Sequence, residues 1–327
     1  QRQMCIRDRQ ERTPDQNLPK VELHRPISKG LLTAYFFSAP LSQAFDEDLV
    51  LFLTAMESGT VKVEEHRQPT VHRLRLRNQT GKLVFILPGT VVYGGMQDRI
   101  IASAALIEPG EQTVDVSAFC VEPARWHPES TRARAFHTLG KHYFHYASPR
   151  VRSRALHHKD QGAVWHVTAL ERAAMARLFR ARLDSSSLRD VYTAEDLPRQ
   201  IEDSLMELKQ TVSDLPDVTG VAFAIGPHLV EINVFASRKM FELCCDMLLG
   251  GYLRDALVLR PRKAAKPPGP GQVAELLSRP ISTITHRSQP ATNNCLTIGR
   301  IDDEYDALIL EYRGLPVFKQ ILNHAAF

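Results

Sequence analysis

The hydrophobic positions of residues 10–126 recur mostly with the two-residue period of β-strands. Val71–Arg77 alternates apolar and basic residues, whereas Leu83–Leu87 is a continuous apolar run typical of a buried strand. Turn-forming residues separate these runs. Further strands are expected at Leu32–Ser38, Thr60–Glu65, Arg99–Ile107 and Thr113–Val121. The pattern therefore predicts an antiparallel β-sandwich or barrel-like core in the N-terminal part.

Helical spacing interrupts this pattern at Ser42–Glu57 and dominates after residue 160. Helices are expected over Thr168–Leu183, along the apolar stripe that ends at Val212, and after Ser237. A strand pair is expected around the turn Gly226–His228, and strand patterns return towards the C-terminus. The fold class predicted is α+β, with helices and a further strand pair packed on the β core.

Composition divides the chain into consecutive segments. Gln1–Arg9 resembles a translated sequencing-adaptor remnant and is set aside. The remaining segments are a β-rich part (10–126), a basic connecting segment rich in His and Arg (127–159), a helical α/β part (160–259), a Pro/Gly-rich linker (260–271) and terminal strands (272–327). We expect the terminal strands to close onto the same fold.

The overall composition excludes several classes of protein. With 43% hydrophobic and 24% charged residues among 327, the chain is neither disordered nor fibrous. Apolar runs stay well below the ~18 residues that cross a bilayer, so no membrane association is expected. The formal net charge is +4, of which Gln1–Arg9 contributes +2, and the small remainder gives only weak support for a nucleic-acid partner.

The cysteines do not form the pattern of a disulfide framework. Outside the first nine residues they are Cys120, Cys244, Cys245 and Cys295, few for a chain of this length and two of them adjacent. We therefore expect a reducing, cytoplasmic location.

The side chains best suited to catalysis or ligand binding lie in two polar clusters. Gly94 and Gly95 precede Gln97, Asp98 and Arg99, which offer an amide, a carboxylate and a guanidinium fork suited to phosphate or carboxylate. Glycines at this point can let the backbone approach a ligand closely.

The second cluster follows the strand expected at Thr113–Val121. It contains Cys120, Glu122, Arg125 and Trp126. If Arg99–Ile107 pairs with that strand as an antiparallel hairpin, both clusters lie at the same open end. Asp98 and Glu122 are then candidate general bases, and Cys120 is a weaker nucleophile candidate because no base is identified beside it.

Each cluster also has a structural interpretation. The glycines can simply form a turn, Arg99 can pair with Glu122, and Cys120 can be a small buried apolar residue. Trp126 and Trp165, the two tryptophans, can pack in the core or stack on a ligand.

The basic segment suggests metal or nucleic-acid binding, and neither is favoured. His142 and His145 lie three residues apart, but acidic ligands and Cys-x-x-Cys or His-Glu-x-x-His motifs are missing, so no metal site is expected. Arginines alternate with aromatic residues there, yet no nucleic-acid-binding module is recognisable. The preferred interpretation is a solvated loop over the sheet. P-loop, dinucleotide-binding and α/β-hydrolase motifs are also missing.

The paired motifs carry a resemblance. Gly94-Gly95-x-Gln97-x-Arg99 followed by Cys120-Val121-Glu122-x-x-Arg125-Trp126 resembles the ARG and Rhodanese-Phosphatase-superfamily-associated protein domain family. The similarity continues through Gln161–Trp165 and Gly220–Phe235 to a helix ending near Ala256. Asp98 stands where the family more often has asparagine, and Ala124 where it commonly has glycine.

The resemblance implies a domain connected with ADP-ribose or nucleotide metabolism, with no established reaction and no cofactor identified. Two hypotheses follow. In the first, the domain binds or acts on an anionic, nucleotide-like small molecule through Gly94, Gly95, Gln97, Arg99, Arg125 and Trp126. In the second, it is a non-catalytic scaffold whose motif residues are structural and which binds a protein partner.

Overall fold

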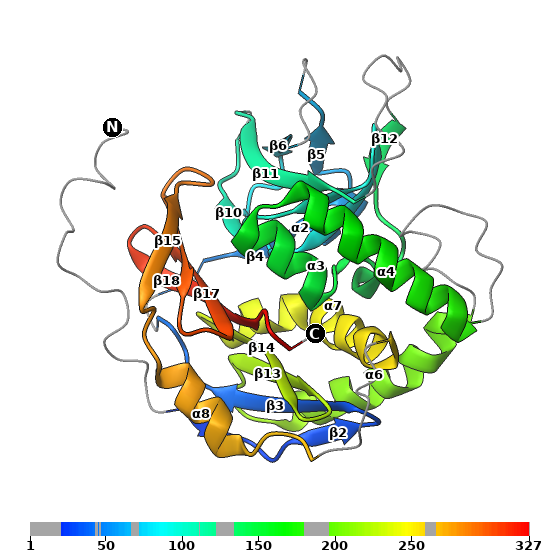
Figure 1. Ribbon diagram of the computed structural model, residues 1–327. Coiled ribbons are helices and arrows are strands. Elements are labelled where there is room, and N and C mark those ends of the chain that lie inside the picture. The colour runs from blue at the N-terminus through cyan, green and yellow to red at the C-terminus, as the bar shows by residue number, and fades with distance from the viewer. Residues whose placement is uncertain are drawn as a thin grey trace.

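The computed structural model describes residues 21–42, 45, 47–66, 72–110, 112–121, 134–179, 196–258 and 266–326. Two β-structures are held together by a layer of helices (Figure 1), which confirms the α+β class. In the described part of the chain, no helix is long and apolar enough to cross a membrane.

The N-terminal β-structure is barrel-like. A six-stranded antiparallel sheet has the order β12-β8-β9-β11-β6-β5, and a three-stranded sheet has the order β10-β7-β4. Because β8 directly follows β7 and β10 directly follows β9, the chain passes between these two sheets at two corners. The strands are β4 (Leu49–Leu51), β5 (Val61–Glu64), β6 (Arg73–Asn78), β7 (Leu83–Ile86), β8 (Thr90–Gly95), β9 (Arg99–Ile101), β10 (Ala105–Ile107), β11 (Val114–Cys120) and β12 (Arg134–His137).

The second β-structure is a nine-stranded antiparallel sheet that combines both ends of the chain. Its order is β1-β3-β13-β14-β18-β17-β16-β15, with β2 also paired to β3. The strands are β1 (Glu22–Leu23), β2 (Ile27–Lys29), β3 (Leu32–Ser38), β13 (Gly220–Ile225), β14 (His228–Phe235), β15 (Thr283–Ser288), β16 (Asn294–Arg300), β17 (Tyr305–Tyr312) and β18 (Leu315–Asn323).

Helices cover the two faces of this sheet differently. On one face Val273 and Leu277 of α8 pack with Ile232 and Ile321. The other face carries Phe223, which stacks on Tyr252 of α7 with ring centroids 4.1 Å apart. The helical segments are α2 (Phe52–Glu57), η1 (His142–His145), α3 (Pro149–Arg152), η2 (Ser153–His158), α4 (Gln161–Phe179), α6 (Asp196–Asp214), α7 (Arg238–Val258) and α8 (Pro270–Ser278).

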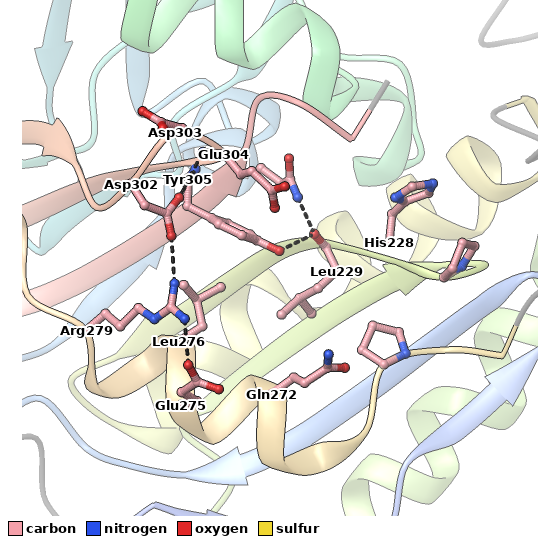
Figure 2. Close-up of a pocket in the computed structure, with 13 residues that line it drawn as sticks. His228, Leu229, Gln272, Glu275, Leu276, Arg279, Asp302, Asp303, Glu304 and Tyr305 are labelled. Atoms are coloured by element: carbon pink, nitrogen blue, oxygen red, sulfur yellow. Dashed lines mark hydrogen bonds and ion pairs between the residues drawn. The ribbon is translucent and has the colours of Figure 1, made fainter.

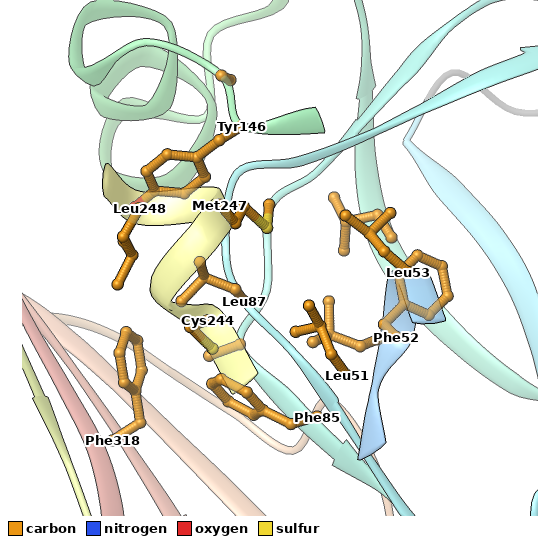
Figure 3. Packing of buried hydrophobic residues seen from close by; sticks show 14 of the residues in the cluster. Leu51, Phe52, Leu53, Phe85, Leu87, Tyr146, Cys244, Met247, Leu248 and Phe318 are labelled. Atoms are coloured by element: carbon orange, nitrogen blue, oxygen red, sulfur yellow. The ribbon is translucent and has the colours of Figure 1, made fainter. Parts of the chain in front are cut away.

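Helix α7 connects the two β-structures through one continuous core. Figure 3 shows Cys244, Met247 and Leu248 of α7 in the same packed cluster as Phe85 of the barrel-like part and Phe318 of the nine-stranded sheet. The rings of Phe85 and Phe318 lie 5.6 Å apart, so the core is shared between the two parts of the chain.

Three local expectations are wrong. Leu49–Leu51 is a strand paired in parallel with β7, so among the described residues of the expected span only Phe52–Glu57, which is α2, is helical. Arg99–Ile107 is two strands in different sheets, since Ala102 to Ala104 turn the corner between them. The third error is that the sequence pattern predicts no strand at β8. Gly89 before it and Gly94 and Gly95 at its end, all with positive φ, are typical of turns and therefore mask the strand pattern.

The linker expected at 260–271 lies partly outside the described residues. Of its described part, Pro270 and Gly271 form the first turn of α8, with Pro at a position that a helix N-terminus tolerates.

Candidate functional site

The first polar cluster and Cys120 of the second lie together at one end of the barrel-like sheet. Strands β9 and β11 are antiparallel neighbours, and Arg99 lies directly opposite Cys120. The backbone N–H of Val121 donates to the carbonyl oxygen of Asp98 at 3.2 Å and continues this pairing. The convergence expected from spacing is therefore present for these residues. Glu122, Arg125 and Trp126 lie outside the described residues.

The Arg99 side chain is fully buried, and its guanidinium binds side chains of the same chain. Its Nη2 donates to both carboxylate oxygens of Glu65 at 3.0 Å each, and its Nη1 lies 2.7 Å from Cys120 Sγ. The Glu65 side chain is 10% exposed, whereas that of Arg99 is 0% exposed. The guanidinium fork is thus held by a described carboxylate rather than displayed to solvent.

Cys120 is held as a neutral thiol. Burial raises the pKa of Cys120 to about 11, an increase that the neighbouring Arg99 charge only partly offsets. Gln161, at the start of α4, accepts from the Cys120 backbone N–H at 3.0 Å and donates to its carbonyl at 2.7 Å. A nucleophilic cysteine needs a thiolate, so this environment opposes that role.

Gln97 is the member of the cluster with unused hydrogen-bonding capacity. Its side chain is 1% exposed, and neither amide atom has a hydrogen-bond partner among the described residues. Asp98 beside it is 5% exposed and accepts from the Gly94 backbone N–H at 2.9 Å. A buried amide with no partner is costly, so a polar group of another molecule would be stabilised there.

The two glycines make room for a neighbouring strand. Gly94 and Gly95 have φ of +112° and +61°. A Cβ on Gly94 would lie 2.5 Å from the Ala135 carbonyl oxygen, and one on Gly95 would lie 2.3 Å from Cζ of Phe136. The space that the sequence assigned to ligand approach is occupied by β12 at these two positions.

A second buried polar centre lies on the inner face of the nine-stranded sheet. Arg152 Nη2 is 2.5 Å from Glu231 Oε2, and both side chains are 0% exposed. Tyr146 and Gln320 donate to Glu231 Oε1 at 2.8 Å each, and Tyr252 donates to Oε2. The Arg152 guanidinium also lies 4.1 Å above the Tyr146 ring. Charges this deeply buried persist only when they are paired and hydrogen-bonded.

Sequence reasoning missed this centre. The interpretation of residues 127–159 as a solvated loop is wrong over its described part, because Tyr146, Val151 and Arg152 are fully buried. The available signal was a polar residue within an apolar strand: Glu231 interrupts His228–Phe235, and Gln320 interrupts Leu315–Asn323.

One histidine of the same segment, His145, has a structural role. His145 is 0% exposed, Nε2 accepts from the Leu139 backbone N–H at 2.7 Å, and Nδ1 lies 2.7 Å from the Val91 carbonyl. Burial lowers the pKa of His145 to about 4, which keeps the ring neutral. Over the described ranges no group of three or more His, Cys, Asp or Glu side chains is arranged to hold a metal ion.

Four hollows on the described surface are lined by residues outside the motif cluster. Figure 2 shows one beside α8, where Arg279 bridges Glu275 and Asp302 with N–O distances of 2.5 and 2.7 Å. Arg279 thus pairs with two of the four carboxylates in that lining, which also contains Asp303 and Glu304. Another hollow, beside β6, β11 and β15, has an excess of cationic groups.

Comparison with known proteins places the chain in a family. The family model of the ARG and Rhodanese-Phosphatase-superfamily-associated Protein domain matches residues 20–302. Neither a curated protein nor a solved structure matches the chain. The matched residues contain β9, β11, α3 and β14 and thus the ion pairs of both Arg99 and Arg152, whereas Gln320 lies beyond them. The chain belongs to the ARG and Rhodanese-Phosphatase-superfamily-associated Protein domain family.

Proposed function

We propose that the domain binds an anionic, nucleotide-like small molecule at the end of the barrel-like sheet where Gln97 lies. The observation that carries this proposal is the Gln97 amide, which is 1% exposed and has no described hydrogen-bond partner. The family name, with its association to ADP-ribose-related and phosphatase-related proteins, is consistent with such a ligand. The mouths of β-barrels are also frequent ligand sites.

In this proposal the motif residues have different roles. Gln97 donates to and accepts from the ligand, and Asp98 fixes the backbone at Gly94 through the 2.9 Å hydrogen bond. Arg99 is a positioning residue because its guanidinium is held by Glu65 and Cys120. Arg125 and Trp126 keep their proposed ligand-binding role, and Asp98 and Glu122 remain candidate bases for any reaction.

A thermal-shift measurement with ADP-ribose, NAD and ADP tests the proposal. We expect at least one compound to raise the Tm of the wild type and Gln97→Leu to lose that rise. The matched control is Gln210→Leu, which changes an exposed glutamine of α6. The proposal fails if none of the compounds raises the Tm, or if Gln97→Leu responds as the wild type does.

A specific observation favours a structural role as the second candidate function. The bidentate contact between Arg99 and Glu65 and the close packing of Gly95 against Phe136 both stabilise the barrel end. As a scaffold, the domain would present this surface to a protein partner. Arg99→Ala would then leave Glu65 without its partner and lower the free energy of unfolding by ~1–3 kcal/mol. Urea unfolding measures this, and wild-type stability of the variant would contradict it.

A further inference from the structure

The hollow between the barrel-like sheet and the edge of the nine-stranded sheet has the properties of an anion site. Its volume is about 530 Å³, within the range of about 300–1,000 Å³ typical of small-molecule pockets. Arg73 of β6, His72 beside it, His286 of β15 and Lys159 after η2 contribute to its wall. These four residues come from three separate parts of the chain.

We propose that this hollow binds the phosphate group of a small phosphorylated molecule. Arg73 supplies a guanidinium fork and Lys159 an ammonium, the two groups that bind phosphate most strongly in proteins. Ser103 and Ser117 line the same hollow and add hydroxyl donors for the remaining phosphate oxygens.

The charge balance of the wall supports an anionic occupant. Asp115 is the carboxylate in this lining, and it lies 3.2 Å from Nε2 of His66. Burial lowers the pKa of Lys159, while burial and the charge of Lys159 lower the pKa of His286. Two cationic groups that repel each other across a hollow are stabilised when an anion enters between them.

The backbone conformation of Lys159 is unusual. Lys159 has φ +52° and ψ +38°, the left-handed conformation that disfavours residues other than Gly, Asn and Asp. It ends the π-helical segment Ser153–His158, a type of turn often found at functional sites. The left-handed residue closes the helix end, because its backbone N–H bonds to the Arg154 carbonyl, and the same turn places Lys159 in the wall of the hollow.

The site is separate from the one under Proposed function. Ser117 faces Arg73 across the strand pair, whereas Cys120 faces Arg99, and these two positions of β11 lie on opposite faces of the sheet. The two proposals can therefore succeed or fail independently.

Isothermal titration calorimetry with pyrophosphate and inorganic phosphate, at low ionic strength, tests the inference. We expect saturable binding of pyrophosphate and a Kd at least tenfold weaker in Arg73→Gln and in Lys159→Asn. Asparagine tolerates the left-handed conformation, so the second variant removes the charge without disturbing the backbone. Arg77→Gln, on the same strand but outside the hollow, is the matched control and should bind as the wild type does. Gln97→Leu should also bind normally.

Two results would overturn the inference. One is the absence of saturable binding of either phosphate compound by the wild type. The other is unchanged pyrophosphate affinity in Arg73→Gln and Lys159→Asn while both variants remain folded by circular dichroism. Binding of a single-stranded RNA oligonucleotide with the same dependence on both residues, in the absence of pyrophosphate binding, would reject a small-molecule ligand in favour of nucleic acid.

Discussion

The barrel-like part and the inner face of the nine-stranded sheet each carry a buried arginine paired with a glutamate, and the two pairs differ in their access to solvent. Arg99 lies at the end of the barrel-like sheet, and its partner Glu65 retains 10% exposure of its side chain. Arg152 lies between η2 and the nine-stranded sheet, and its partner Glu231 has none. Glu231 also receives hydrogen bonds from two tyrosines and a glutamine.

The comparison shows that the residues of an easily recognised sequence motif need not be those whose loss destabilises the fold most. Arg99 belongs to a motif that is easily recognised in the sequence, but its ion pair is near enough to solvent for water to replace part of a lost contact. Arg152 belongs to no recognised motif, yet its charge has no access to water. The space for its side chain also depends on Gly89, where a Cβ would lie 2.1 Å from Cδ of Arg152.

The largest expected effect comes from removing each carboxylate. Glu231→Gln leaves the Arg152 charge buried and unpaired, so we expect the free energy of unfolding to fall by ~3–5 kcal/mol. Glu65→Gln should cost clearly less, because water can approach the 10% exposed Glu65 position. Urea unfolding of both variants measures the difference.

The surface pair of Glu275 with Arg279 is the control for this comparison. The Glu275 side chain is 62% exposed, so Glu275→Gln should change stability by less than ~1 kcal/mol. Equal losses for Glu231→Gln and Glu65→Gln would remove the proposed difference between the two centres.

The next effect is a pH dependence located on the Arg152 side. Burial, reinforced by the charge of Asp255, raises the pKa of Glu171 from 4.5 to about 7. The native state thus favours the protonated form, and its contribution is complete below pH 4.5 and is lost as pH rises through about 7. This loss amounts to ~3 kcal/mol. On the motif side, the pKa of Cys120 is raised to about 11, and this thiol stays neutral throughout that range.

Glu171→Gln tests this assignment, because glutamine cannot titrate. We expect the stability of the variant, measured by urea unfolding from pH 4.5 to 7.5, to decline less with pH than that of the wild type. A matched change at the exposed Glu242 of α7 should leave the profile unaltered. Parallel profiles for Glu171→Gln and the wild type would show that other groups cause the decline.

The smallest effect concerns Gly95, the second glycine of the motif. Gly95→Ala combines an unfavourable φ of +61° with a Cβ only 2.3 Å from the Phe136 ring, and we expect a loss of ~2–3 kcal/mol. Gly81→Ala has a similar φ of +74° with no atom within 4 Å, and should lose only ~1 kcal/mol. Comparable losses in thermal or urea unfolding would mean that β12 is not tightly packed on Gly95.

The sequence predicts the barrel-like half well because its strands alternate along a half-buried surface. The expected spans Thr60–Glu65 and Thr113–Val121 contain β5 and β11, and Arg99 lies opposite Cys120 in the antiparallel pair of β9 and β11. The errors occur where tertiary pairing overrides local pattern, as when Leu49–Leu51 joins β7 in place of extending a helix.

The Arg152 centre could not be predicted from local pattern, since its partners are distant in sequence. Arg152 lies on α3 and Glu231 on β14, and only the tertiary fold brings the two side chains together. The roles of Gln97 and Arg99 were also indistinguishable in the sequence, although one is unpartnered among the described residues and the other is held by Glu65. Burial and pairing decide such roles, and neither is a local property.

The nine-stranded sheet combines strands from both ends of the chain, and this has a consequence for folding during synthesis. Strand β3 is made early, yet the strand that covers its inner edge, β13, begins at Gly220. At bacterial or eukaryotic rates of translation this interval lasts roughly 10 to 40 s. The barrel-like part can fold on the ribosome during that time. Leu32–Ser38 meanwhile keeps an apolar edge that lacks its β13 partner, and such an edge favours aggregation or chaperone binding.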